Sequence, residues 1–199
     1  MKNKMIKLAV VAAASVALAQ TVQAGLINGS VTFAGGVALD TTSAGTATEV
    51  VSWTGPQGSG LLTPVVESSS LDLAAVFNAP VTFSPNWVFG AGANPLWSYT
   101  GLDGDTFTFD LVSSYIFSQG GSPASVTVDG TGTITATGPV AFSATTGTWS
   151  FSTQNPSAGT PAVFSFSAAA GSVPDGGTTA MLLGAALSGL ALLKRKLVA

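Results

Sequence analysis

The chain has 199 residues, no cysteine and no histidine, and its few charges are unevenly placed. All six basic residues lie within the first seven or the last six positions, whereas residues 25–172 hold eight acids and no base, a formal charge of −8. Such a body repels phosphates and has no basic patch that could release counterions, so nucleic acid is excluded as a partner. The absence of cysteine excludes disulfides and thiolate metal ligands.

The first 24 residues have the layout of a secretory signal peptide. Lys2, Lys4 and Lys7 precede an apolar run at residues 8–19, and Val22 and Ala24 supply small side chains before a cleavage site. We therefore predict export through the Sec translocon and cleavage by signal peptidase between Ala24 and Gly25. Because no cysteine follows this site, lipid attachment there is not expected.

Residues 25–172 have a length that fits one domain, and their pattern is that of β-strands. Phe107, Phe109 and Leu111 alternate with polar residues, which places them on one face of a half-buried strand. The same alternation occurs at Val31 and Phe33, at Trp149 and Phe151, and at Phe164 and Phe166. With many Gly and Pro turn signals between the runs, the sequence predicts an all-β fold, a single antiparallel β-sandwich or jelly-roll-like domain.

The longest alternating run covers residues 125–137. Its apolar side carries Val126, Val128, Ile134 and Ala136, and its other side carries four threonines and Asp129. A threonine-lined outer face suits a solvated strand, because β-branched side chains fit a pleated surface. Gly130 and Gly132 fall on the apolar side, where we expect a bulge or the close approach of another layer.

The acidic residues offer two chemistries, both weakly indicated. Asp103 and Asp105 flank a turn and are candidate calcium ligands, since calcium prefers carboxylate oxygens, but two acids that solvate an ordinary turn are the favoured explanation. A carboxylate-based glycoside-active enzyme is the least favoured alternative, because the odd spacing of Asp105 and Asp110 predicts opposite faces of a strand. Without histidine a serine nucleophile lacks its usual base, so we expect a noncatalytic protein that needs no cofactor.

Aromatic residues raise the alternative of a carbohydrate-binding module. Exposed rings could stack on sugars, and the candidates are Trp53, Trp87, Trp97, Tyr99 and Trp149. Trp149 alternates in phase with Phe151 and is expected in the core. Trp87 and Trp97 flank a Gly- and Pro-rich segment at residues 90–95, which predicts that they lie on a loop.

Residues 173–199 combine a short polar motif, an apolar run and a basic tail. The run at residues 178–193 has sixteen residues, so a helix there would be roughly 24 Å long, slightly short of a bilayer core. Lys194, Arg195 and Lys196 follow it and can reach the headgroups, which predicts a transmembrane helix with residues 194–199 in the cytoplasm and the body outside.

The motif itself is Val173-Pro174-Asp175-Gly176-Gly177. With the apolar run and the basic tail, it resembles the C-terminal sorting signals of the PEP-CTERM class, in the VPDSG-CTERM variant, with Gly176 where the variant's name has Ser. The resemblance implies processing by an exosortase in a Gram-negative bacterium, a transient membrane anchor, and delivery to the cell surface or extracellular matrix. It also implies association with exopolysaccharide or biofilm, which is the function that we expect.

Overall fold

The computed structural model describes residues 24–154 and, for the backbone alone, residues 162–170. None of the described residues forms an α-helix, and this part of the chain has no helix long and apolar enough to cross a membrane. The predicted signal helix, apart from Ala24, and the predicted transmembrane helix at residues 178–193 lie outside these ranges. The elements are β1 (Gly25–Leu26), β2 (Gly29–Leu39), β3 (Glu49–Thr54), β4 (Val65–Ser69), the 3-10 turn η1 (Leu71–Leu73), β5 (Thr82–Phe83), β6 (Trp87–Val88), β7 (Ala93–Thr100), β8 (Thr106–Gly120), β9 (Ser125–Thr137), β10 (Phe142–Ser143), β11 (Thr145–Gln154) and β12 (Ala162–Ala170).

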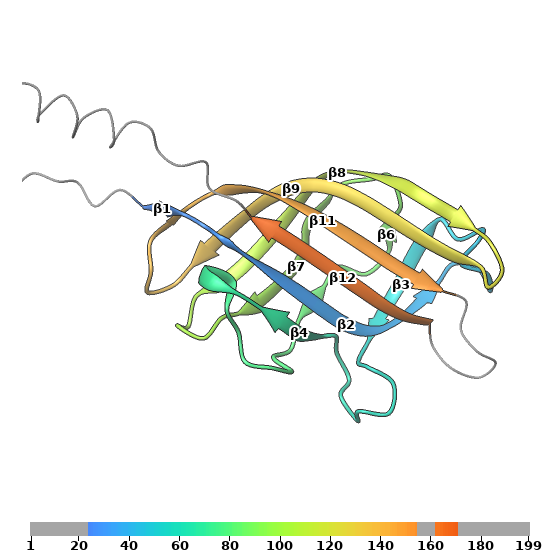
Figure 1. Cartoon of the computed structure of the whole chain (residues 1–199), viewed down its shortest axis with the longest axis horizontal. Helices are drawn as coiled ribbons and strands as arrows, with labels where there is room; N and C mark the ends of the chain where they lie inside the picture. The colour runs from blue at the N-terminus through green and yellow to red at the C-terminus, as the bar shows by residue number, and fades with distance from the viewer. Residues whose placement is uncertain (1–23, 155–161, 171–199) are drawn as a thin grey trace, which may run out of the picture.

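Ten of these strands form one sheet, which confirms the predicted all-β class. Its order is β5-β7-β8-β9-β11-β12-β2-β3-β6, with β4 also paired to β2, and every pairing is antiparallel. From β7 to β12 the long strands follow one another as a meander, so each hairpin pairs neighbours in sequence (Figure 1). The short strands β1 and β10 form a separate parallel pair.

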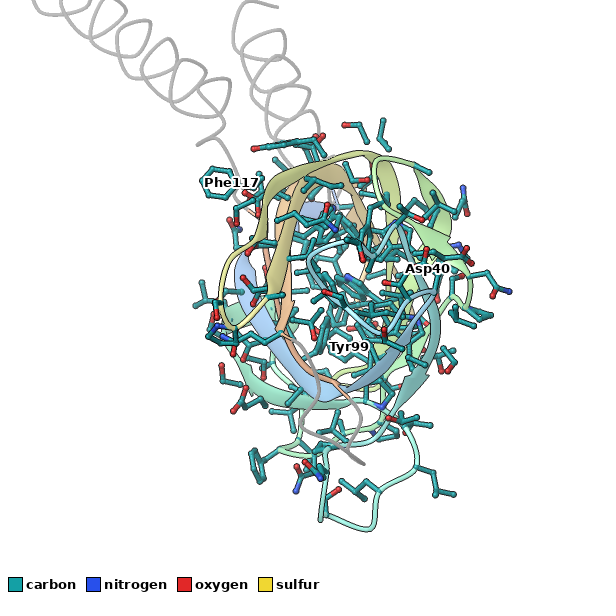
Figure 2. The ribbon with its side chains drawn as sticks, turned by 90° about the vertical axis from the view of Figure 1, so that its right-hand side faces the viewer. Asp40, Tyr99 and Phe117 are labelled. Carbon is teal, nitrogen blue, oxygen red and sulfur yellow. The ribbon has the colours of Figure 1, made fainter. Side chains whose placement is uncertain are left out.

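The two edges of the sheet are brought together by residues 82–88. β5 pairs with β7 at one edge, and β6, four residues later, pairs with β3 at the other. Ser84 joins both sides: its N–H donates to the Leu96 carbonyl (2.9 Å), and its carbonyl accepts the Trp53 indole N–H (2.7 Å). The sheet is therefore rolled around its own core, as the end-on view in Figure 2 shows, whereas two stacked sheets were predicted.

The interior of the rolled sheet is filled mainly by aromatic rings. Trp97 stacks on Phe109 with ring centroids 5.3 Å apart, and Trp53 stacks on Phe83 at 4.4 Å. Phe33 contacts the edge of Trp97 at 5.1 Å, which links β2 to β7 across the core. Such pairs add to the stabilisation that burial of their apolar area provides. The core therefore spans the interior from the meander to the short strands β5 and β6.

Six aromatic residues alternate with polar ones at residues 107–111, 149–151 and 164–166, which predicts that they face the core, and four of the six are buried. Phe107, Phe109, Trp149 and Phe151 are each at most 4% exposed. The other two, Phe164 and Phe166, lie in β12 opposite Thr153 and Phe151, and their side chains fall outside the described part of the structure. Their burial stays a prediction.

Gly130 and Gly132 show why glycine is needed on the inner face of β9. A side chain at Gly132 would collide with the ring of Phe109 and the Asp110 carbonyl, and one at Gly130 would meet the Ser113 carbonyl and the Trp149 indole nitrogen. The register of β8 also shifts between Leu111 and Ser113, opposite these glycines. The expected bulge is therefore present, on β8 opposite the glycines, whereas the close approach comes from β8 and β11, the neighbours of β9 in the same sheet, and not from another layer.

We predict that Phe109→Ala lowers the free energy of unfolding by about 3–5 kcal/mol, because it leaves a cavity where a fully buried ring packs on Trp97. Phe117→Ala is the matched control: it lies on the same strand but is 67% exposed, so its cost should stay within about 0.5 kcal/mol. Chemical denaturation followed by tryptophan fluorescence measures both. Equal stabilities of the two variants would contradict this account of the core.

Candidate functional site

The sorting motif predicted at residues 173–177 follows directly on the last described strand. β12 lies inside the sheet between β11 and β2, and its final residue, Ala170, pairs with Gly147 on one side and Gly29 on the other. Two residues separate Ala170 from Val173. The motif and the basic tail themselves lie outside the described residues. The fold therefore fixes the point from which the motif starts.

The two acids of the β7–β8 turn, Asp103 and Asp105, differ in their exposure to solvent. Asp103 is exposed, whereas Asp105 is 2% exposed and its Oδ1 accepts the backbone N–H of Val140 at 3.0 Å. This bond ties the β7–β8 turn to the connection that follows β9. The described residues contain no group of three or more acidic residues that could hold a metal ion. In this structure Asp105 joins two connections, and a calcium-binding role for the pair remains untested.

The acids considered for glycoside chemistry do not form a pair. Asp105 is buried, on the same side as Phe107 and Phe109, whereas Asp110 is half-buried on the outer face of β8 opposite Thr133. This agrees with the opposite orientation that their odd spacing predicts. A carboxylate pair acting on one glycosidic bond needs both groups on one side of the sugar site.

Asp40 is another acid whose partners are backbone and hydroxyl donors. It follows β2, and its carboxylate accepts the N–H groups of Thr48 and Glu49 and the Thr48 hydroxyl, the last at 2.6 Å. Desolvation pushes the pKa of the exposed Asp40 up, but the hydrogen bonds from Thr48 and Glu49 outweigh it and lower that pKa below its ordinary value. Asp40 closes the β2–β3 connection.

The aromatic residues considered for sugar stacking belong to the core. Trp87, Trp97, Tyr99 and Trp149 are at most 4% exposed, and Trp53 is half-buried against Phe83. The prediction that Trp87 and Trp97 lie on a loop was wrong: they lie in β6 and β7, which close the sheet. Tyr99 lies inside the ring of strands in Figure 2, donates to the Leu73 carbonyl (2.7 Å), and has its pKa raised by burial.

The outer face of the meander is a surface of hydroxyl groups. Threonines stand opposite one another in the pairs Thr106–Thr137, Thr108–Thr135, Thr131–Thr148 and Thr133–Thr146, on the three adjacent strands β8, β9 and β11. Neighbouring hydroxyls are thus spaced about 5 Å across the strands and about 7 Å along them. The sequence predicted the threonines of β9, and only the register showed that three strands share one array.

The sequence pattern missed an exposed apolar strip in the second half of β8. Val112, Tyr115, Ile116 and Phe117 are between 41% and 70% exposed, and Figure 2 shows Phe117 outside the ring of strands. The pairing with β7 ends at Leu111, and two register shifts follow along β9. The signal was present in the sequence as the loss of alternation after Leu111.

Comparison with known proteins bears on the motif. Residues 172–197 match the family model of the VPDSG-CTERM motif. They are a C-terminal sorting signal of the PEP-CTERM type. No curated protein and no solved structure matches the chain. The VPDSG-CTERM signal thus begins two residues after Ala170, where β12 ends, and it indicates an exported protein that an exosortase-like enzyme processes.

We predict that Asp105→Ala lowers the free energy of unfolding by about 1–3 kcal/mol, because the part-buried N–H of Val140 loses its acceptor, the buried Asp105 carboxylate. Asp103→Ala, the control in the same turn, should change it by less than about 0.5 kcal/mol because that residue is exposed. Thermal unfolding with calcium and with a chelator completes the test. If calcium raises the stability of the parent and of neither variant, the two acids form a metal site and the structural explanation fails.

Proposed function

We propose that this chain is an exported, exosortase-sorted, noncatalytic protein of the cell surface or extracellular matrix, associated with exopolysaccharide or biofilm. The observation that carries the proposal is the VPDSG-CTERM signal at residues 172–197, which directly follows the folded body. The N-terminal segment supports it, because its basic residues, apolar run and Ala24 fit a cleaved signal peptide. Gly25, the expected mature N-terminus, is the first residue of β1.

The proposed route places the body outside the cytoplasmic membrane. Residues 178–193 would hold the chain transiently in the bilayer as a helix, with Lys194, Arg195 and Lys196 on the cytoplasmic side. Pro174 favours an extended backbone at Val173, and Gly176 and Gly177 permit turns. An accessible, extended motif next to the membrane suits a processing enzyme embedded there.

The surface of the body supports a matrix role. Its threonine array on β8, β9 and β11 offers hydroxyls that can exchange hydrogen bonds with hydrated polysaccharide. The body has no base that would bind acidic polymers through charge. A carbohydrate-binding module that stacks sugars on Trp87, Trp97 or Trp149 receives no support, because these rings are buried. The separation of Asp105 and Asp110 supports a noncatalytic role.

We predict that replacing Val173, Pro174 and Asp175 by alanine blocks processing and leaves membrane insertion intact, because the apolar run is unchanged. Fractionation of the source bacterium should then find the uncleaved chain in the membrane and little in the surface or matrix fraction. Neutral residues at 194–196 provide a second variant, which should weaken the orientation of the anchor instead. If a chain that lacks residues 173–199 reaches the surface fraction in the parent's amount, the sorting proposal is wrong.

The polysaccharide association is tested by co-sedimentation of the exported protein with exopolysaccharide from the source organism. We predict that a variant with Thr131, Thr133 and Thr148 replaced by valine binds several-fold less, because valine keeps the shape and removes the hydroxyl. Replacement of the same three residues by serine is the control, since it keeps the hydroxyl and should retain most binding. Binding that is equal in the parent and the valine variant would show that this face is not the contact surface.

A further inference from the structure

The end of the rolled sheet where β12 stops collects several other connections, and we call it the exit end. The β7–β8 turn, the β9–β11 connection, the start of β2 and η1 all lie there, near β1 at the left of Figure 1. The N–H of Leu102 donates to the Ala74 carbonyl (2.9 Å), and Ser70 donates to the Ser30 carbonyl (2.9 Å). These bonds join the β7–β8 turn, η1 and β2 into one surface.

Each connection at the exit end presents an exposed aliphatic side chain. The four residues, which we call the apolar rim, are Leu26 (39% exposed), Leu71 (73%), Leu102 (60%) and Val140 (42%). A single exposed leucine is common on protein surfaces, but four on separate segments around one end of a sheet form a distinct surface feature. The apolar rim therefore calls for a partner that accepts aliphatic side chains.

Leu71 stands beside the point where the chain leaves the body. Its Cβ lies next to Gly29, and Gly29 is the β2 partner of Ala170. The φ angle of Leu71 is 53°, a left-handed value that a leucine rarely adopts. Hydrogen bonds on both sides hold it there, from Ser70 to Ser30 and from Asp72 to the Asn28 carbonyl (3.0 Å). The fold thus fixes an exposed leucine at the exit point.

We propose that the apolar rim rests on the outer surface of the lipid bilayer in which residues 178–193 are anchored. This inference rests on the proposed anchor. Eight peptide units join Ala170 to Thr178, so even a fully extended chain spans at most about 29 Å. The short tether keeps the exit end within that distance of the bilayer, so the rim is at a high local concentration near the lipid. The rim would then hold residues 173–177 at the membrane surface, where an exosortase acts.

The charges at the exit end specify the kind of lipid. Asp72 and Asp103 are exposed there, and residues 25–172 contain no base that could attract anionic headgroups. Contact must therefore come from the aliphatic side chains, as at other interfacial protein surfaces. We expect the rim contact to be strongest on zwitterionic lipid, where salt should change it little. Added anionic lipid should weaken the contact, and salt should partly restore it by screening the repulsion.

The absence of cysteine from the chain allows a direct test by single labels. Leu71→Cys and Leu102→Cys place an environment-sensitive fluorophore on the rim of the full chain. Phe117→Cys is the matched control. Phe117 is 67% exposed, but it lies roughly 35 Å along β8 from Thr106, the residue at which this strand begins near the rim. The labelled chains are reconstituted in phosphatidylcholine vesicles that contain lipid spin-labelled near the headgroup. We expect the two rim labels to be quenched at least threefold more than the label at position 117.

The outcomes distinguish failure of the proposed membrane anchor from failure of the proposed contact between rim and lipid. A full chain that does not float with the vesicles overturns the proposed anchor, and the rim contact falls with it. A chain that floats but shows equal quenching at positions 71, 102 and 117 overturns the rim contact alone. Rim labels that respond only when exosortase-containing membranes are added would assign the surface to a protein partner, and they too would overturn the lipid contact.

Discussion

Closure of the sheet around its aromatic core is the constraint on which the rest of this structure depends. Residues 82–88 pair with β7 through β5 and with β3 through β6, and Ser84 bonds to both sides. Closure covers part of the edges formed by β7 and β3 and encloses Trp53, Phe83 and Trp97 together. Because the rings are used for closure, they do not serve as an exposed ligand platform. On the outer face of β8, β9 and β11, threonine hydroxyls lie at the surface instead.

A body without a basic side chain must satisfy its acids in other ways. Asp105 accepts the N–H of Val140, Asp40 accepts the N–H groups of Thr48 and Glu49, and Asp72 accepts the N–H of Asn28. Each bond joins a connection to a neighbouring segment, so these carboxylates stabilise loops. This favours a structural role for the acids over a catalytic one, and it leaves a surface that repels anionic polymers and lipids.

The direction of the sheet links the fold to sorting. The antiparallel meander brings the end of β12, the start of β2 and η1 to the same end of the sheet, so the VPDSG-CTERM signal leaves the body from there. The opposite end carries the β8–β9 hairpin with its exposed apolar residues. The signal therefore leaves from the end of the sheet opposite that hairpin.

Local patterns in the sequence determined the strands and the signal, and long-range contacts decided the rest. Alternation identified Phe107, Phe109 and Phe151 as core residues, because inside and outside alternate within a single strand. The VPDSG-CTERM signal could be predicted from the sequence, because its motif, apolar run and basic tail follow one another directly along the chain. The burial of Trp87 and Trp97 could not be predicted from the sequence, since it depends on residues 82–88 pairing with strands distant in the chain. For Phe117 the sequence offered only the loss of alternation after Leu111, and the tertiary structure shows that β7 ends before reaching it.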